Sequence, residues 1–194
     1  MSNIIQVLLE EHRNIDKLLT VLEHELEVFD RSEEPDYEIL RAVIEYFQDY
    51  PEDCHHPKED LVFAKLKMRD PAAAERIGDV EAEHDVEGLR LRRLVEAVEN
   101  ILAGRELLRQ TFHDAVHDFI KHQRQHMDKE ERLLFPAAVQ RLRPEDWAAI
   151  DAHVNDRKDP LFNGAIETKF QALQRTILRW EREAASGRVK TARV

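Results

Sequence analysis

The sequence predicts an all-α protein: a bundle of four helices, formed by one helix pair that occurs twice, with additional C-terminal helices. Three observations predict this fold. Apolar residues recur at steps of three and four along most of the 194 residues, no long segment alternates as a strand does, and only five residues are glycine. Four such apolar stripes, separated by turn residues, account for residues 2 to about 142. A chain of this length can bury a core without disulfides.

The first two predicted helices form the first pair. Ser2 is a candidate N-cap, and the apolar stripe that follows it continues to about Asp30. Asp36 is a candidate N-cap for the second helix, whose stripe is interrupted by Pro51 and Pro57. Because proline removes a main-chain hydrogen bond, we expect this helix to bend there.

The third and fourth predicted helices form the second pair, after a short helical turn expected over residues 72–77. Asp79 is a candidate N-cap for the third helix, and Gly104 is a candidate C-terminal stop. The fourth and longest stripe runs from Arg105 to Pro136.

Two further segments follow the four helices. Pro144 begins a short fifth segment, and Asp159-Pro160 begins a final helix. Its apolar residues are spaced by three and four, as in a helix that packs on another helix: Phe162, Ile166, Phe170, Leu173, Ile177 and Trp180. They can pack on the bundle or form a homodimer with a second subunit, and both remain open. We therefore divide the chain into a bundle (1–142), a helical extension (143–185) and a flexible basic tail (186–194).

The composition limits the classes of partner. A net charge of −11, from 40 acidic and 29 basic residues, argues against a nucleic-acid partner. No apolar run approaches the roughly 20 residues of a membrane span, and the N-terminus has no signal pattern. The single cysteine, Cys54, excludes an internal disulfide and is expected to be a small buried residue rather than a redox-sensitive thiol. We expect a cytoplasmic protein without a membrane partner.

Two short motifs place a histidine and a glutamate four residues apart. They are His55 with Glu59, and His126 with Glu130. Residues four apart share one helix face, so an imidazole and a carboxylate converge there as metal ligands do. One such motif is weak evidence in a chain with 36% charged residues, but here it recurs, with a lysine before the glutamate each time.

A Glu-His pair precedes each motif within an apolar stripe. His12 lies 43 residues before His55, and His84 lies 42 residues before His126. The duplicated helix pair therefore turns six donors toward one bundle axis, as in a two-metal site: His12, His55, Glu59, His84, His126 and Glu130. Burying each polar group without a partner costs about 1–3 kcal/mol. A divalent cation would supply that partner.

Other polar residues near the motifs have several possible placements. His56 lies about 100° round the helix from its neighbour and is a ligand, a group that contacts a ligand, or a surface residue. We expect His122 to line the site or to hydrogen-bond to it. Asp60 and Glu131 are expected to face water or to hydrogen-bond the site from outside. The remaining histidines, which have no counterpart in the repeat, are expected on the surface: His24, His113, His117 and His153.

At these residues the chain resembles the hemerythrin-like (HHE cation-binding) family. Residues 55–60 have the form H-H-x-x-E-[DE], and residues 126–136 have the form H-M-x-x-E-E-x-x-L-F-P. The resemblance covers residues 3 to about 140 and implies an up-down-up-down four-helix bundle that holds a non-haem di-iron centre bridged by carboxylates. It places ligands at His12, His55, Glu59, His84, His126 and Glu130, and at His56 in some members.

The chain differs from the oxygen-carrying hemerythrins at two positions. Their third helix looks like His-x3-His, whereas the residue four after His84 is Gly88. Their last ligand is an aspartate five residues after the last histidine, whereas Glu130 lies four residues after His126 and Glu131 lies five. The resemblance therefore implies a centre closer to the bacterial and regulatory HHE proteins than to a reversible oxygen carrier.

The mixed imidazole and carboxylate ligands suit iron, manganese or zinc. We expect two iron ions with a bridging oxo or hydroxo group, and an open position that takes O2, peroxide or nitric oxide. The sequence contains no dedicated electron-donor motif, which favours binding or sensing of these molecules. The alternatives are a di-iron enzyme, either peroxidase-like or NO-reducing, and an iron or zinc storage protein.

Overall fold

The computed structural model describes residues 3–154, 159–162 and 166–191, which contain helices and no strand. In chain order these are α1 (Asn3–Asp30), α2 (Tyr37–Tyr50), the π-helical turn η1 (Pro51–His55), α3 (His56–Arg69), α4 (Pro71–Ile77), α5 (Val80–Leu102), α6 (Arg109–Lys129), the π-helical turn η2 (Glu130–Leu134), α7 (Phe135–Arg141), α8 (Pro144–Asp151), the short 3₁₀ helix η3 (Thr168–Phe170) and α9 (Gln171–Thr191). The prediction of an all-α fold is confirmed.

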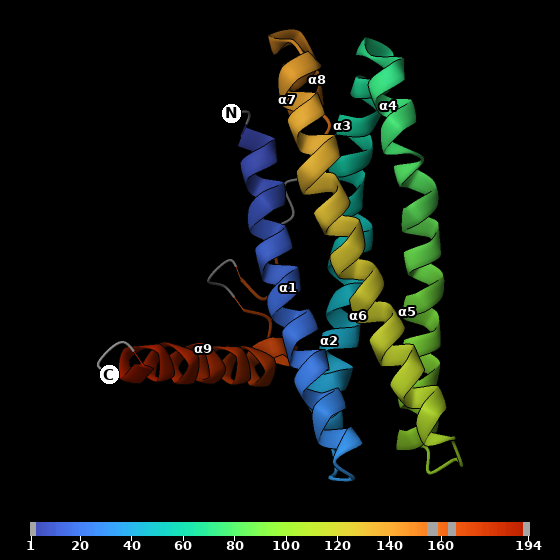
Figure 1. The fold of residues 1–194 in the computed structure, drawn as a ribbon, viewed down its shortest axis with the longest axis vertical. Coiled ribbons are helices and arrows are strands. Elements are labelled where there is room, and N and C mark those ends of the chain that lie inside the picture. The colour runs from blue at the N-terminus through green and yellow to red at the C-terminus, as the bar shows by residue number, and fades with distance from the viewer. Residues whose placement is uncertain (1–2, 155–158, 163–165, 192–194) are drawn as a thin grey trace.

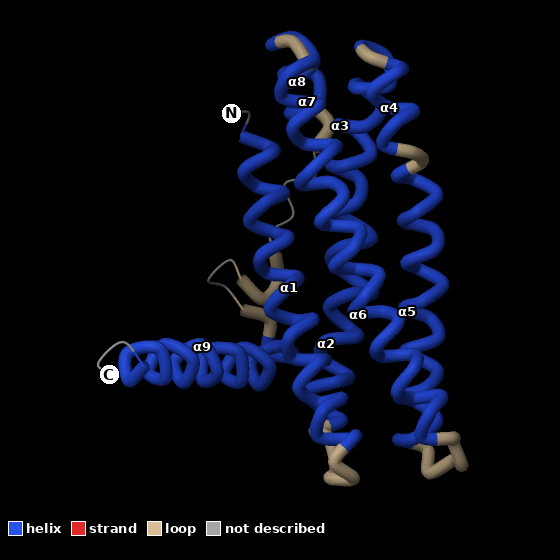
Figure 2. The backbone as a smooth tube through the Cα atoms, viewed as in Figure 1, coloured by secondary structure: helices blue, strands red, loops and turns tan. Residues whose placement is uncertain are grey.

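Four long rods lie side by side in Figure 1: α1, α2 with α3, α5, and α6 with α7. Short loops join the rods at the two ends of the bundle (Figure 2). Helix α9 leaves the side of the bundle near α1 and α2 and points away from it. None of the described helices is both long and apolar enough to cross a membrane.

Two of the rods contain a π-helical turn next to a predicted ligand. The bend expected near Pro51 and Pro57 takes this form, since η1 begins at Pro51 and ends at His55. The second turn, η2, begins at Glu130 and was not predicted. A π-helical turn accommodates an extra residue in a helix and often occurs at functional sites, because it redirects the side chains near it.

Aspartates cap two of the helices as predicted. Asp36 Oδ1 accepts the main-chain N–H groups of Glu38 and Ile39 at 3.1 Å each. Asp79 Oδ1 accepts that of Ala82 at 3.2 Å. These caps satisfy amides that have no partner within the helix. The third predicted cap, Ser2, lies outside the described residues.

Replacing Asp36 with alanine should lower the free energy of unfolding by about 1 kcal/mol, because two amides lose their acceptor. Chemical denaturation measures this change. The variant D36N keeps a side-chain oxygen at the same place and should unfold near the wild-type midpoint. Equal stabilities for D36A and the wild type would show that water replaces the cap without loss.

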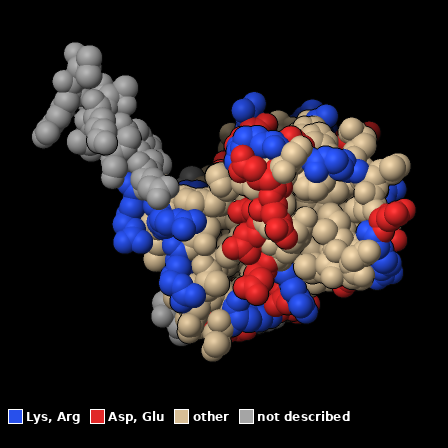
Figure 3. All heavy atoms as spheres, turned by 90° about the horizontal axis from the view of Figure 1, so that it is seen from below, with Lys and Arg blue, Asp and Glu red and all other residues tan. Residues whose placement is uncertain are grey.

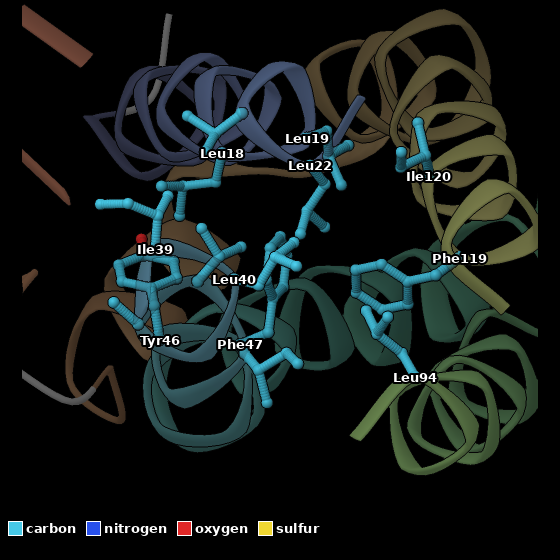
Figure 4. Close-up of a cluster of buried hydrophobic side chains, with 14 of the residues drawn as sticks. Leu18, Leu19, Leu22, Ile39, Leu40, Tyr46, Phe47, Leu94, Phe119 and Ile120 are labelled. Carbon is cyan, nitrogen blue, oxygen red and sulfur yellow. The ribbon is translucent and has the colours of Figure 1, made fainter. Parts of the chain in front are cut away.

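Two apolar clusters fill the bundle. The larger lies between α1, α2, α5 and α6, where Leu18, Leu40, Leu94 and Phe119 point toward one another (Figure 4). The smaller joins the start of α1 to α3, α4, α7 and α8. Along α1 the smaller cluster ends at Leu8 and the larger begins at Ile15, so His12 lies between them. The predicted ligands therefore occupy a polar layer between two apolar ones.

The C-terminal extension packs on the bundle through buried contacts. Arg69 Nε donates a hydrogen bond to Asp146 Oδ2 at 2.7 Å, which ties α8 to α3. Tyr46 Oη donates to Asp159 Oδ2 at 2.9 Å, although 113 positions separate the two residues. The apolar side chains Leu161, Phe170, Leu173 and Ile177 are buried in the larger cluster. The first half of the predicted final helix thus packs on the bundle, while pairing with a second subunit stays a prediction.

The predicted start of the final helix is wrong. The helical residues begin at Thr168, not at Asp159-Pro160. The Oδ1 atom of Asp159 accepts the main-chain N–H groups of Leu161 and Phe162 at 2.8 and 3.0 Å, so this aspartate stabilises a turn. Phe162 and Ile166 pack against the larger cluster ahead of the helix. Helix α9 continues to Thr191, and residues 192–194 lie outside the described part of the chain.

The fourth helix also starts later than predicted, at Arg109 instead of Arg105. Gly104 has a positive φ of 65°, a conformation that ends α5 and that glycine adopts without strain. The connection then continues to Leu108, which has extended backbone angles.

Candidate metal centre

Four imidazoles and two carboxylates converge at the middle of the bundle, each from a rod that the sequence predicted. His12 lies on α1, His55 ends η1, and Glu59 lies on α3. His84 lies on α5, His126 lies on α6, and Glu130 begins η2. All six are buried. The two apolar clusters on either side hold the rods that carry them.

Glu59 lies at the centre of this group. Its Oε1 atom lies 3.0 Å from His12 Nε2 and 3.3 Å from His55 Nε2. Its Oε2 atom lies 3.5 Å from His84 Nε2. One carboxylate therefore faces imidazoles from three different helical segments.

Glu130 faces the remaining imidazole. Its Oε2 atom lies 3.4 Å from His126 Nε2 and 3.5 Å from His12 Nε2. The Nε2 atoms of His126 and His84 lie 3.1 Å apart. Two sets of donor atoms, each within 4.8 Å of one another, can hold a metal ion: His12, His55 and Glu59, and Glu59, His84, His126 and Glu130.

The carboxylates of this layer lack the partners that buried anions require. The Oε2 atoms of Glu130 and Glu59 have only long contacts with imidazole nitrogens, at 3.4 to 3.5 Å. Neither these two atoms nor Oε1 of Glu130 has a well-aligned hydrogen-bond partner among the described residues. Burial, with the charge of Glu59, raises the pKa of Glu130 to about 7. Burial also acts to raise the pKa of Glu59, but the charge of His55 and hydrogen bonds from His12 and His84 hold it well below its usual value. Bound cations would supply the missing partners, so the residues fit metal ions.

Two of the imidazoles, His12 and His84, have raised pKa values. Burial alone lowers the pKa of His12, but its contacts with Glu130 and Glu59 outweigh this effect and raise the pKa to about 11. Burial is likewise outweighed at His84, where Asp60 and Glu59 raise the pKa to about 10. A metal ion binds the neutral imidazole, so its binding must displace the protons of these two rings.

The outer nitrogen of His55 has a carboxylate partner of its own. His55 Nδ1 donates to Glu11 Oε2 at 2.9 Å. The other oxygen of Glu11 accepts hydrogen bonds from Lys58 and, at 2.7 Å, from Tyr50. All four residues are buried. A carboxylate on Nδ1 fixes the orientation of the imidazole and leaves Nε2 for the metal.

The second half of the bundle repeats this arrangement. His126 Nδ1 donates to Glu83 Oε2 at 3.1 Å, and Lys129 donates to the other oxygen of Glu83. The contacts of these glutamates and lysines were not predicted. The signal was present, because a glutamate precedes the first histidine and a lysine precedes the second glutamate in both repeats.

The other two imidazoles have their outer partners in the opposite half of the bundle. His12 Nδ1 donates to Glu131 Oε1 at 3.0 Å, and His84 Nδ1 lies 3.1 Å from Asp60 Oδ1. Glu131 is therefore hydrogen-bonded to the site from outside, which is one of the two predicted placements. These contacts join the two helix pairs across the metal layer.

His56 lies beside the two donor sets and belongs to neither. Its ring stacks on that of His84, with centroids 4.1 Å apart and planes 10° apart. Its Nε2 atom lies 3.5 Å from Oε2 of Glu87, which accepts a hydrogen bond from Gln123 at 3.0 Å. Burial raises the pKa of Glu87 to about 7. Glu87 was not predicted to lie at the site, because the first repeat has Ile15 at the corresponding position.

The remaining histidines lie away from the two donor sets. His122 Nε2 accepts a hydrogen bond from Arg90 Nη2 at 2.7 Å and lines a cavity beside the site. Of the four histidines predicted on the surface, His24, His117 and His153 are exposed, and His113 is half-buried. Cys54 is fully buried, as predicted.

A bundle of helices with histidines and glutamates converging in a buried layer defines a helical metal-binding protein. Comparison with known protein families identifies the family within this class. Residues 3–138 match the model of the hemerythrin HHE cation-binding domain, so the chain belongs to that family. The resemblance stated from the two motifs is confirmed. Searches of the curated proteins and of the solved structures found no match.

The outer carboxylates provide a direct test of the site. The variant E131A should weaken metal binding by about 10- to 100-fold, because His12 loses the partner that orients its ring. Titration with a competing chelator measures the affinity. The control is E10A. Glu10 is an exposed glutamate of α1, two residues before His12, and among the described residues it pairs only with Arg13. Equal affinities for E131A and the wild type would show that Glu131 does not support the site.

Proposed function

We propose that this protein binds two iron ions at the buried layer and that the resulting non-haem di-iron centre binds or senses O2, peroxide or nitric oxide. The observation that carries the proposal is the position of Glu59. It belongs to both donor sets, so one carboxylate serves two ions. The unpartnered oxygens of Glu130 support a second anionic donor in the same layer.

The chain's own residues would orient the ions and protect them from water. Outer carboxylates hold the four ligand imidazoles by their Nδ1 atoms. The apolar clusters on both sides exclude bulk water from the layer, which limits side reactions. Iron bound there supplies affinity for small ligands and one-electron redox chemistry.

Small molecules, rather than nucleic acid, are the proposed partners. The chain has a net charge of −11. In the end-on view of Figure 3, a band of acidic side chains interrupts the basic ones across the bundle. The net negative charge disfavours a phosphate backbone, whereas O2, hydrogen peroxide and nitric oxide carry no net charge.

Metal analysis of protein purified from iron-supplemented cells tests the proposal, together with visible absorption before and after peroxide. We expect two irons per chain and an iron charge-transfer band that changes with oxidation. Bound metal whose absorption does not respond to oxidants would instead indicate storage. Sustained consumption of peroxide or nitric oxide with an electron donor would indicate an enzyme.

A further inference from the structure

The duplicated bundle has two equivalent seams beside the metal layer. Each seam contains a glutamate and lysine pair: Glu11 with Lys58 in the first half, and Glu83 with Lys129 in the second. The first two side chains are 7% and 4% exposed, whereas the second two are 39% and 24% exposed. The same pair is thus buried in one half and open in the other.

The C-terminal extension accounts for the closed seam. Tyr50 binds Glu11, and Tyr46, one turn earlier on α2, binds Asp159 of the extension. The rings of Tyr46 and Tyr50 lie 5.8 Å apart, so neighbouring tyrosines bind Asp159 and Glu11. Leu161 is fully buried in the same apolar cluster as both tyrosines. The extension therefore covers the seam between α1 and the rod formed by α2 and α3, on the α2 side.

Among the described residues, no segment of the extension lines the seam between α5 and α6, which contains a cavity of about 340 Å³. Val86 lines it from α5 and Gln125 from α6, and both are exposed. The corresponding residues of the closed seam, Asn14 and Cys54, are buried. The lining also includes His126, whose Nε2 atom belongs to a donor set of the metal layer.

The floor of this cavity is polar. Besides His126 it includes Glu87, which is 5% exposed and whose Oε1 atom has no hydrogen-bond partner among the described residues. Polar groups of this kind let water and small polar ligands pass, because they offer hydrogen bonds inside the protein. Arg90 and Lys129 lie in the same lining as Glu83 and Glu87, so the charges of the cavity are balanced and do not select ions of one sign.

A second cavity, of about 800 Å³, lies between α1 and α6 and reaches His12. The inner end of this cavity differs from that of the α5–α6 cavity. The ring of His12 is only 2% exposed and stacks on Phe135, with centroids 5.4 Å apart. Met127, which is 7% exposed, also lines this end. The ring of His12 and the side chain of Met127 thus close the inner end of this cavity.

We propose that small ligands reach the metal layer through the α5–α6 seam, over His126, and that the C-terminal extension closes the equivalent seam. The ligands are small neutral or singly negative molecules of the size of hydrogen peroxide or azide. This inference rests on the proposed function, since it assumes that the centre takes an external ligand. It adds that ligands enter from one of the two equivalent seams and not from the other.

Bulky substitutions in the two cavities test the route. The variants V86W and Q125W fill the α5–α6 cavity from opposite walls, at exposed positions where tryptophan does not disturb the core. The probe is azide, added to iron-loaded protein, with binding followed by stopped-flow absorption. We expect azide association to slow by about tenfold or more in both variants, because a ligand must wait for the side chain or helix to move. Iron content should remain unchanged.

The matched control is R13W, which fills the α1–α6 cavity at a residue that is 61% exposed. Its azide association should match that of the wild type. Slower binding in R13W alone, or unchanged binding in V86W and Q125W, overturns the route while leaving the di-iron proposal intact. A wild-type protein without iron, or one whose spectrum does not respond to azide or peroxide, overturns the proposed function and this route with it.

Discussion

Metal binding should be abolished when Glu59 and Glu130 are both replaced by alanine. Glu59 belongs to both donor sets, and Glu130 completes the set that contains His84 and His126. Without these carboxylates, neutral imidazoles would have to hold two divalent cations in a buried layer with no negative charge in contact. Taking such charges out of water without counter-charges costs several kcal/mol per ion. Metal analysis after dialysis against iron, with visible absorption, measures the loss.

The single variants and a control complete this experiment. E59A should lose more metal than E130A, because its carboxylate serves both donor sets. A double variant of His113 and His153, neither of which belongs to a donor set, should keep full metal content. Full metal content in the glutamate double variant would contradict the assignment of the site.

The second large effect concerns stability without metal. Removing the metal with a chelator should lower the free energy of unfolding by about 4 kcal/mol for each bound ion, relative to protein with free metal at about 1,000 times its Kd. The metal stabilises the folded state because only folding brings together donors as distant in sequence as His12 and Glu130. It also supplies partners for the buried oxygens of Glu59 and Glu130 that otherwise have none.

Thermal denaturation with and without chelator measures this difference. The glutamate double variant serves as the control, since chelator should not change its melting temperature. If the wild-type melting temperature were equally insensitive to chelator and to added metal, the layer would not couple metal binding to folding.

Much of the site was predictable because its signals are local. Two residues four apart on a helix share a face whatever the rest of the chain does, so His55 with Glu59 and His126 with Glu130 were recognisable as pairs. The apolar stripes predicted the rods that carry them. The outer glutamates Glu11 and Glu83 were equally visible in the repeat, but their contacts with the imidazoles were not inferred.

Where the prediction failed, tertiary contacts overrode a local pattern. Phe162 and Ile166 have helical spacing and apolar side chains, yet both precede the helix, because Asp159 stabilises a turn and both side chains pack directly against the larger cluster. Glu87 gave no signal, since a single glutamate on a charged helix is ordinary. Its burial depends on α6, which supplies Gln123.

The sequence alone determined the helical class, the duplicated pair and the donor residues that point inward, because each follows from spacing within a single helix. Only the tertiary structure decided that Glu59 serves both donor sets and that one of the two equivalent seams is closed. Those features depend on contacts such as that between Tyr46 and Asp159, which lie far apart in the chain and meet only when the helices pack. Helical periodicity carries no information about which surface a later segment will cover.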